Sequence, residues 1–197
     1  MPVPQSVTLK PASSETLDVG CGRYKVPGAI GIDRYDWPEV DIIHDLDLYP
    51  WPFESNSFTH VICRHSLPHL ANVVTAMEEV YRITRAGGLV EIVVPHFSSD
   101  NAFTDITTQV FFGYRSMDYF CVDRTMRYRY GKCIFRLQEV RMSFLQAHEF
   151  QADKKKFNLF SILGLEWLIN RFPRYYEHFL SFVLRANEVY YRLEVLK

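Results

Sequence analysis

The sequence predicts an α/β fold with one sheet that begins with parallel strands and ends with antiparallel strands. Two patterns in its 197 residues predict this fold. Short, largely apolar runs recur between residues 17 and 94, as in parallel strands buried on both faces. Near the C-terminus, residues 188–195 alternate between apolar and polar side chains, which is typical of half-exposed antiparallel strands.

The parallel half contains five expected strands and one clear helix. The strands cover residues 17–19, 29–32, 40–44, 60–63 and 89–94. Between the last two, residues recur at helical spacings of three, four and seven at Leu70, Val73, Met77, Val80, Tyr81 and Thr84. We expect this helix to end at Gly87-Gly88, because glycine readily adopts the left-handed conformation of a C-cap. A strand, a helix and a strand in this order form a right-handed parallel crossover.

The C-terminal third follows a different pattern. Residues 140–144 alternate in the same way as 188–195, so we expect a second antiparallel strand there. Between them, residues 157–172 are apolar on almost every side, and a helix should start near Pro173 with an apolar stripe at Tyr176, Phe179, Leu180 and Val183. We interpret residues 1–197 as a single domain. Its less regular segments are a loose lead-in (1–15), a substrate-side insertion (96–132) and a helical insertion before the last strand (147–186).

Composition narrows the class of protein. The formal net charge is −1 and both signs are mixed along the chain, which argues against a nucleic-acid partner. No apolar run reaches the roughly 18 residues needed to span a bilayer, and the N-terminus shows no export signal, so we expect a cytoplasmic location. The 4 cysteines show no CxxC spacing and are expected to be reduced thiols.

Acidic residues follow the expected strands in order. Asp18 precedes the glycine loop at 20–22, Asp33 closes the second strand, and Asp45 follows the third. The carboxyl ends of parallel strands form the ligand-binding edge of an open α/β sheet. There, one carboxylate could bind the hydroxyls of a ribose and another the amine of an adenine. Only residues 23–28 separate the loop from the next strand, too few for the helix that pyrophosphate cofactors need, so a nucleoside is favoured over NAD or FAD.

Four segments between residues 16 and 95 have the sequences LDVGCG, GID, HDLDLYPWPFESNSFTHVICRHSLPHL and EEVYRITRAGGLVEIVVP. Together they resemble the class I S-adenosylmethionine-dependent methyltransferases of the methyltransferase type 11 group. The resemblance implies a Rossmann-like, seven-stranded sheet that is parallel except for an antiparallel last strand. It also implies S-adenosyl-L-methionine as the cofactor, here with the first crossover helix shortened or missing.

The resemblance implies cofactor contacts from the loops after the first four strands. The glycine loop would hold the methionine end, the acid after the second strand the ribose, and the Asp-Leu pair after the third strand the adenine, with Asp47 as an alternative to Asp45. The expected cofactor-binding residues are Asp18, Gly20, Cys21, Gly22, Asp33, Arg34, Asp45, Leu46, Cys63 and His65. The sequence departs from the family at Tyr24, which replaces a glycine, and at Thr59 and Pro68, which replace acidic residues.

His96 is the expected general base, because it directly follows the fifth strand and histidine titrates near neutral pH. A pocket-lining role is its alternative, since methyl transfer can proceed by positioning alone. The residues expected to line the acceptor pocket are His69, Phe97, Ser98 and Tyr114. His65 and His69 have the spacing of a helical metal pair, but Pro68 between them disfavours a helix, so no metal site is expected.

We therefore expect an enzyme that transfers a methyl group from S-adenosylmethionine, in line, to a small-molecule acceptor. Two other interpretations stay open. One is a module that binds the cofactor, or its nucleoside, without turnover. The other is a nucleotide-dependent oxidoreductase, which the short glycine loop disfavours. For the aromatic C-terminal third, core packing, a homodimer face, an apolar substrate channel and weak attachment to a membrane surface are the alternatives.

Overall fold

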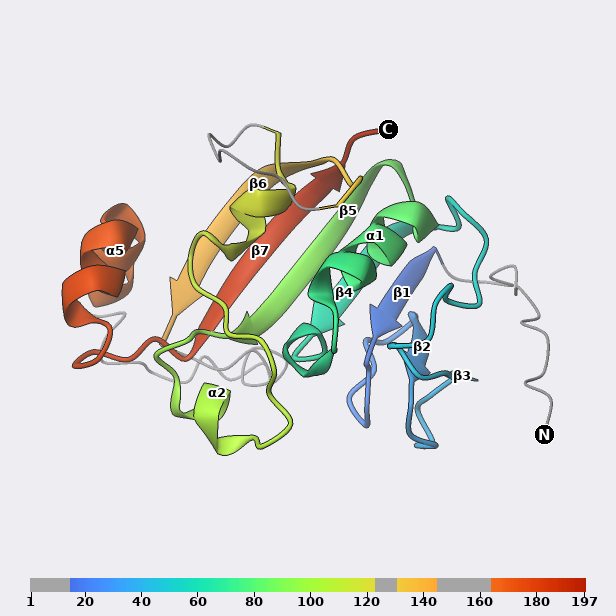
Figure 1. Cartoon of the computed structure of the whole chain (residues 1–197), viewed down its shortest axis with the longest axis horizontal. Helices are drawn as coiled ribbons and strands as arrows, with labels where there is room; N and C mark the ends of the chain where they lie inside the picture. The colour runs from blue at the N-terminus through green and yellow to red at the C-terminus, as the bar shows by residue number, and fades with distance from the viewer. Residues whose placement is uncertain (1–14, 123–130, 145–163) are drawn as a thin grey trace.

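The computed structural model describes residues 15–122, 131–144 and 164–197, which form one seven-stranded sheet in the order β3-β2-β1-β4-β5-β7-β6 (Figure 1). The strands are β1 (Thr16–Val19), β2 (Ile30–Asp33), β3 (Ile42–Ile43), β4 (Phe58–Arg64), β5 (Thr84–Pro95), β6 (Phe135–Ser143) and β7 (Glu188–Val195). Neighbouring strands from β3 to β5 pair in parallel, whereas β7 is antiparallel to both β5 and β6. The predicted α/β sheet with an antiparallel last strand is confirmed.

The order of the strands reverses at β1, which pairs with β2 on one side and with β4 on the other. Leu17 is opposite Ile30 in β2 and Val61 in β4. Ligands of open α/β sheets bind at such a reversal, outside the carboxyl ends of the strands. The loops that follow β1, β2 and β4 therefore meet at one edge.

Within the described ranges, the one long crossover helix is α1 (Val73–Ile83), between β4 and β5. Asn72 caps its N-terminus by accepting the Thr75 N–H at 3.1 Å. The helix ends at Ile83, so the predicted end at Gly87-Gly88 is wrong. Thr84 is already extended, and its hydroxyl donates to the Val80 carbonyl at 2.6 Å, which satisfies a carbonyl of the last turn.

Gly87 and Gly88 belong to β5 and not to the end of the helix. Thr84 pairs with Phe58 and Leu89 pairs with His60, so residues 85–88 lie in an irregularity of the ladder. Gly87 has a positive φ of 72° there. Glycine is the residue that adopts this conformation without steric cost.

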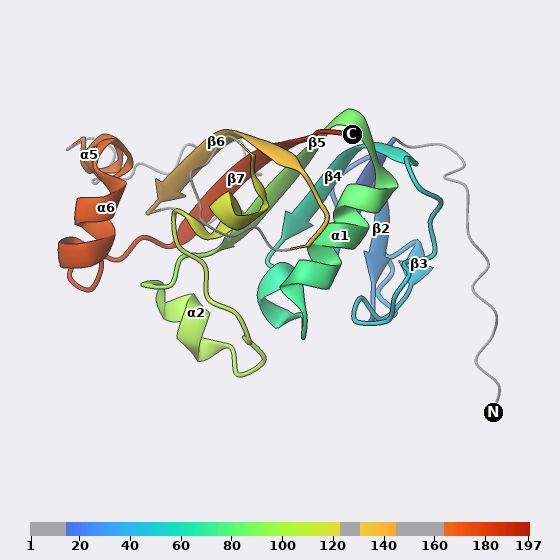
Figure 2. The ribbon, with the colours of Figure 1, turned by 45° about the horizontal axis from the view of Figure 1, so that its top comes forward.

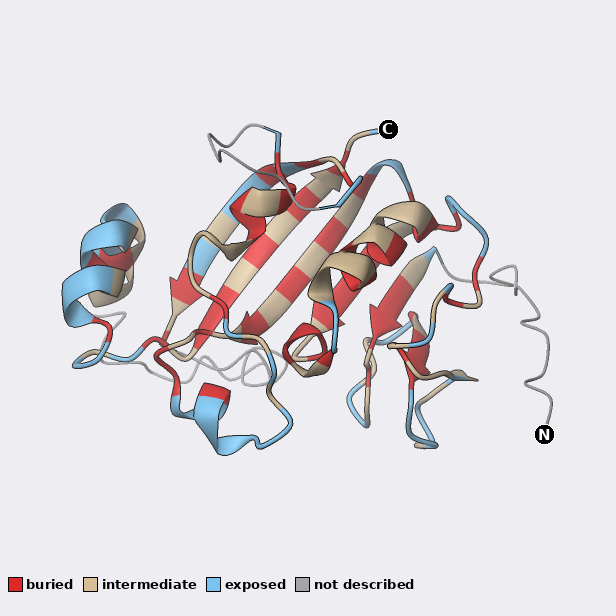
Figure 3. Ribbon diagram, viewed as in Figure 1, coloured by how far each residue is buried: buried red, intermediate tan, exposed pale blue. Residues whose placement is uncertain are grey.

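No helix lies between β1 and β2, between β2 and β3, or between β3 and β4, where all residues are described. The prediction that the first crossover helix is shortened or missing is confirmed. Figure 3 shows that buried residues alternate with half-exposed ones along β5 and β7. Val90, Ile92 and Leu193 are fully buried in the same core as Met77 of α1, while Glu91 and Arg192 stay half-exposed. Consecutive residues of β1, β2 and β4 are buried, as expected for parallel strands covered on both faces, whereas β5 is half-exposed on one side.

The remaining helical segments in the part of the chain that the structure describes are short. They are η1 (Leu67–His69), α2 (Asp100–Thr104), η2 (Ser116–Phe120), α5 (Leu165–Arg171), α6 (Pro173–Tyr175) and the π-helical η3 (Tyr176–Leu180). α2 lies beside the carboxyl end of β5, and α5 and α6 lie beyond the edge of the sheet formed by β6 (Figure 2). No helix of the described residues is long and apolar enough to cross a membrane.

The predicted start of a helix at Pro173 agrees with α6, but the predicted stripe is wrong. Tyr176 is buried, whereas Phe179, Leu180 and Val183 are exposed. The switch to π-helical hydrogen bonding at Tyr176 changes the residue period, so the stripe no longer follows one face. Residues 1–14 of the lead-in and residues 157–163 of the apolar run lie outside the described residues, and the rest of that run contains α5. The bounds of the insertions at 96–132 and 147–186 stay predictions.

Candidate functional site

A cavity of about 620 Å³ opens at the carboxyl ends of β1, β2 and β4. This volume is typical of a small-molecule site. Its walls come from the loops after β1, β2, β3 and β4 and from the segment after α2. The lining residues are Gly20, Gly22, Asp33, Arg34, Tyr35, Trp37, Asp45, Leu46, Asp47, His65, Ser66, His69, Leu70, Asp105, Ile106, Thr107 and Gln109.

The glycine loop lies against the loop that follows β4. Gly20 has a φ of +68° and donates its N–H to the Ile32 carbonyl at 2.8 Å. A Cβ on Gly20 would come within 2.4 Å of the Ser66 Cβ, closer than any real contact. The backbone is therefore bare at the cavity wall, where only glycine fits.

Asp33 is the acid at the end of β2, and it is held rigidly at the cavity wall. Its Oδ2 accepts the Gly22 N–H at 2.9 Å and its Oδ1 accepts the Tyr35 N–H at 3.0 Å. The residue is 8% exposed. A carboxylate can accept about four hydrogen bonds, so each oxygen keeps capacity for a ligand hydroxyl.

The loop after β3 forms the opposite wall. Asp45 accepts the Asp47 N–H at 3.2 Å and lies 3.7 Å from the Arg34 guanidinium. Asp47 in turn accepts the Ala71 N–H at 2.9 Å. Leu46, between the two acids, is buried and presents an apolar surface to the cavity. An apolar floor flanked by carboxylates suits a flat heterocycle that bears an amine.

His65 occupies an unusual backbone conformation at the end of β4. Its φ is +56°, in the left-handed region, and its N–H donates to the Val93 carbonyl at 2.8 Å. Non-glycine residues in this region cluster at functional sites, where the surrounding structure enforces the conformation. The next residue, Ser66, has a buried hydroxyl with no hydrogen-bond partner among the described residues.

His69 faces the segment after α2. Its Nδ1 lies 2.9 Å from the Thr107 hydroxyl, and its Nε2 lies 4.0 Å from Asp105. The Thr107 hydroxyl and N–H both donate to Asp105, which lowers the pKa of that carboxyl, with a smaller contribution from His69. The sequence predicted His69 as a pocket residue, and it lines the cavity.

Of the ten predicted cofactor-binding residues, seven line this cavity: Gly20, Gly22, Asp33, Arg34, Asp45, Leu46 and His65. Asp18, Cys21 and Cys63 do not line it and are buried behind it. Burial, reinforced by the charges of Asp18 and Asp33, raises the pKa of Cys21 to about 12. These three residues support the wall.

Asp18 anchors the connection between β1 and β2. Its Oδ2 accepts the Val26 N–H at 2.8 Å and pairs with the Arg64 guanidinium at 2.9 Å. Arg64 also donates to the Tyr24 carbonyl. Burial raises the pKa of Asp18, and the Arg64 charge opposes that shift. Arg64 therefore holds the loop between β1 and β2 against the sheet, where a crossover helix would otherwise pack.

The structure does not bring His96 to the cavity. Its side chain is fully buried, with Nδ1 at 2.8 Å from the Ser98 hydroxyl and Nε2 at 3.3 Å from the Glu177 carboxylate. Phe97 packs on its ring, and the Tyr114 N–H donates to Glu177 at 2.6 Å. None of these predicted substrate-side residues lines the cavity, because the His96 side chain is directed into the core toward Glu177.

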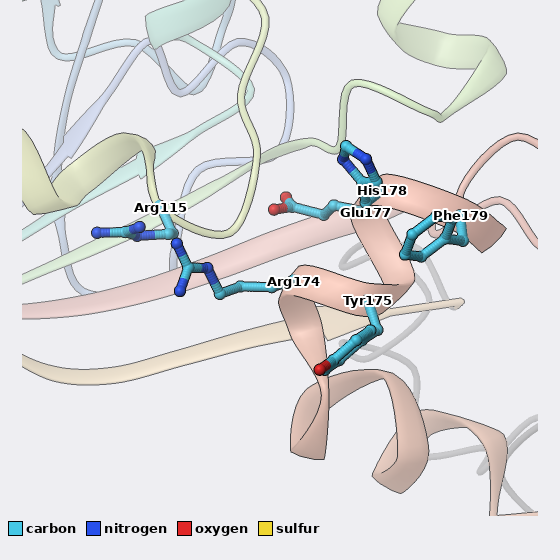
Figure 4. Close-up of a pocket in the computed structure, with 6 residues that line it drawn as sticks. All are labelled: Arg115, Arg174, Tyr175, Glu177, His178 and Phe179. Atoms are coloured by element: carbon cyan, nitrogen blue, oxygen red, sulfur yellow. The ribbon is translucent and has the colours of Figure 1, made fainter.

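Glu177 lines a different hollow of about 560 Å³ on the outside of the C-terminal helical segment. Figure 4 shows Arg115 and Arg174 beside it, with the rings of Tyr175 and Phe179 on the same helical segment. Both rings are exposed. This hollow shares no residue with the cavity at the glycine loop.

A second compartment of about 470 Å³ adjoins the cavity. His65, His69 and Asp105 line both, so they form the shared wall. The other residues lining the compartment are Pro95, Asn101, Thr104, Thr108 and Glu188. Glu188, the first residue of β7, was not predicted as a site residue, because only the pairing of β7 with β5 brings it near His65.

Comparisons with known proteins agree with the fold. Residues 29–92 match the family of methyltransferase domains. The structure is similar to a SAM dependent methyltransferase from Archaeoglobus fulgidus, with a TM-score of 0.55 and 13% identity over 94% of this chain and 87% of that chain. It is also similar to a chain of the complex between the Haloferax volcanii Trm112 methyltransferase activator and a methyltransferase, with a TM-score of 0.51 and 15% identity over 98% and 87% of the two chains.

A third similar structure is Haemonchus contortus phosphoethanolamine N-methyltransferase 2, solved with phosphomonomethylethanolamine and S-adenosylhomocysteine. Its TM-score is 0.50 at 16% identity, and the match covers 93% of this chain and 49% of that chain. No match was found among curated protein sequences. The resemblance to class I methyltransferases is confirmed by the match over residues 29–92 together with the shared fold.

Proposed function

We propose that this chain, which has the fold of the class I methyltransferases, is an S-adenosylmethionine-dependent methyltransferase that acts on a small molecule. The observation that carries the proposal is the Asp33 carboxylate, fixed at the end of β2 by the Gly22 and Tyr35 N–H groups at the wall of a cavity of about 620 Å³.

The residues around the cavity fit the cofactor. The bare backbone at Gly20 and Gly22 would receive the methionine end, where a Cβ on Gly20 would collide with Ser66. Asp33 would accept hydrogen bonds from the ribose hydroxyls. Leu46 would lie under the adenine, with Asp45 within the same loop to accept from its amine. The bound cofactor supplies an electrophilic methyl group on a sulfonium that is already a good leaving group.

The task of the protein is then to position the acceptor in line with that methyl group. The compartment of about 470 Å³ beyond His65 has the size of a small-molecule site, which supports a small acceptor. His96 lies outside both compartments, so we do not propose it as the base.

The proposal is tested by calorimetric titration with S-adenosylhomocysteine. We expect saturable binding by the wild-type protein and at least about tenfold weaker binding by Asp33→Ala, because a hydrogen bond to a charged group contributes about 1.5–3 kcal/mol. Asp33→Asn, which keeps the shape of the side chain, should also bind more weakly. Asp36→Ala is the matched control, since Asp36 is exposed and does not line the cavity.

Absence of binding to folded wild-type protein would overturn the proposal. Equal binding by Asp33→Ala and Asp36→Ala would overturn the assignment of Asp33 to the ribose. Circular dichroism of each variant provides the check on folding, because Asp33 also holds the backbone of the glycine loop.

A further inference from the structure

The compartment beyond His65 contains a buried carboxylate, one oxygen of which accepts no hydrogen bond from the described residues. Glu188 is 4% exposed and lines the compartment. Its Oε1 lies 3.0 Å from Nε2 of His65. Even so, Oε1 makes no hydrogen bond with suitable angles among the described residues. A buried polar atom without a partner is costly, and such atoms commonly meet a ligand or water.

Apart from His65 and His69, the ionisable groups that line the compartment are acidic. Its described lining contains two carboxylates, Asp105 and Glu188, and no lysine or arginine. Thr104, Thr108 and Asn101 complete a polar lining. Such a surface disfavours an anionic ligand by like-charge repulsion and favours a group that donates hydrogen bonds.

We propose that this compartment is the acceptor subsite, and that Glu188 recognises an acceptor that presents an N–H or O–H group and carries no negative charge beside it. The inference rests on the proposed function, because His65 forms the wall between this compartment and the proposed cofactor cavity. The left-handed backbone at His65 directs the chain between the two compartments at the end of β4.

The chemistry balances with the groups present. The lone pair of the acceptor oxygen or nitrogen forms the new bond to the methyl carbon, while the carbon–sulfur bond breaks and its electron pair stays on sulfur. The N–H or O–H proton passes to Oε1 of Glu188 and then to Nε2 of His65, 3.0 Å away. The His65 side chain is 38% exposed, so it can return that proton to solvent.

The test requires no knowledge of the acceptor. Sinefungin is an S-adenosylmethionine analogue in which an amine-bearing carbon replaces the methylated sulfur, so its ammonium group occupies the place of the transferred methyl. We expect wild-type protein to bind sinefungin about tenfold or more tightly than S-adenosylhomocysteine, because the Glu188 carboxylate attracts the ammonium group across the place of the acceptor atom. In Glu188→Gln this ratio should fall to near one, while S-adenosylhomocysteine binds within about twofold of wild type.

Two further variants sharpen the comparison. Glu194 is on the same strand, lines neither compartment and lies 3.0 Å from the Arg136 guanidinium. Glu194→Gln should therefore keep the wild-type ratio. His65→Asn should keep the fold, because asparagine tolerates the left-handed region. It should reduce the ratio less than Glu188→Gln does, since the carboxylate remains.

Each outcome separates the two proposals. Suppose that S-adenosylhomocysteine binds but that sinefungin binds no more tightly to the wild type. The assignment of Glu188 is then overturned and the proposed cofactor site stands. The same conclusion follows if the tighter binding of sinefungin persists in Glu188→Gln, or is lost only in Asp105→Asn. If neither compound binds to the folded protein, the proposed function itself fails. Thermal unfolding of each variant identifies any that do not fold.

Discussion

At the scale of single residues, the site depends on where the backbone is bare. Gly20 and Gly22 both have positive φ angles, of 68° and 51°, so both favour glycine. They differ in their surroundings. A Cβ on Gly20 would meet Ser66, whereas a Cβ on Gly22 would meet nothing within 4 Å. Substituting each glycine by alanine therefore distinguishes the free-energy cost of the left-handed backbone from that of the contact with Ser66.

We predict that Gly22→Ala lowers the free energy of unfolding by about 1 kcal/mol, from the left-handed conformation alone. Gly20→Ala should cost about 3 kcal/mol, because overpacking against Ser66 is added. Urea denaturation of both variants measures the difference. Adding Ser66→Gly to Gly20→Ala should recover part of the loss, and equal costs for the two single variants would show that the Ser66 contact is unimportant.

Residues were predictable from sequence where the signal is local. Asp33 and Asp45 follow expected strands directly, and both line the cavity. His96 also follows a strand directly, yet its ring turns into the core toward Glu177, a residue far along the chain. Glu188, Thr107 and Ser66 carried no local signal, because strand pairing and loop packing bring them to the site. The position of a residue directly after a strand therefore predicts that it lies at the ligand edge of the sheet. It does not predict the direction of the side chain.

At the scale of elements, the connection from β1 to β2 replaces a helix with one ion pair. Asp18 is fully buried, and the Arg64 side chain is 18% exposed. A buried charge that loses its partner is strongly destabilising. The short connection therefore depends on Arg64, which reaches both Asp18 and the Tyr24 carbonyl.

We predict that Arg64→Ala lowers the free energy of unfolding by about 3–5 kcal/mol at neutral pH. Arg136→Ala, which breaks the exposed pair with Glu194, should cost about 1 kcal/mol or less. Urea denaturation compares the two, and similar costs would contradict the anchoring role.

The deficit of Arg64→Ala should also depend on pH. Burial raises the folded-state pKa of Asp18 above its ordinary value of 3.8, so the folded state takes up the proton first as the pH falls. The protonated carboxyl has no charge to compensate. The difference between wild type and variant should therefore shrink as the pH falls toward that raised pKa, and Asp18→Asn should remove this pH dependence.

Element types were predicted better than element ends. The alternation at 188–195 matches β7 (Glu188–Val195), because a period of two is unambiguous over eight residues. The predicted end of α1 was wrong, because it relied on the glycines at 87 and 88. The helix ends before Thr84, whose hydroxyl donates a hydrogen bond to the Val80 carbonyl. The stripe after Pro173 failed because π-helical turns do not keep the α-helical period.

At the scale of the whole molecule, the sequence pattern predicted parallel strands followed by antiparallel strands, while the order of the strands and the coverage of the sheet come from the structure. The order β3-β2-β1-β4-β5-β7-β6 puts the loops after β1, β2 and β4 at one edge. α1 covers one face, and the charged residues Glu91, Arg192 and Glu194 stay half-exposed along β5 and β7. The chain keeps the ligand edge of the fold while omitting the helices of its first three connections.

We propose above that the cavity beside Gly20 and Asp33 binds S-adenosylmethionine. A crystal structure of the protein with S-adenosylhomocysteine would show whether it does. We expect the ribose hydroxyls on Asp33, the adenine over Leu46 and the sulfur facing His65. Ligand density elsewhere, or a nucleoside that leaves Asp33 uncontacted while the protein is saturated, would contradict the claim.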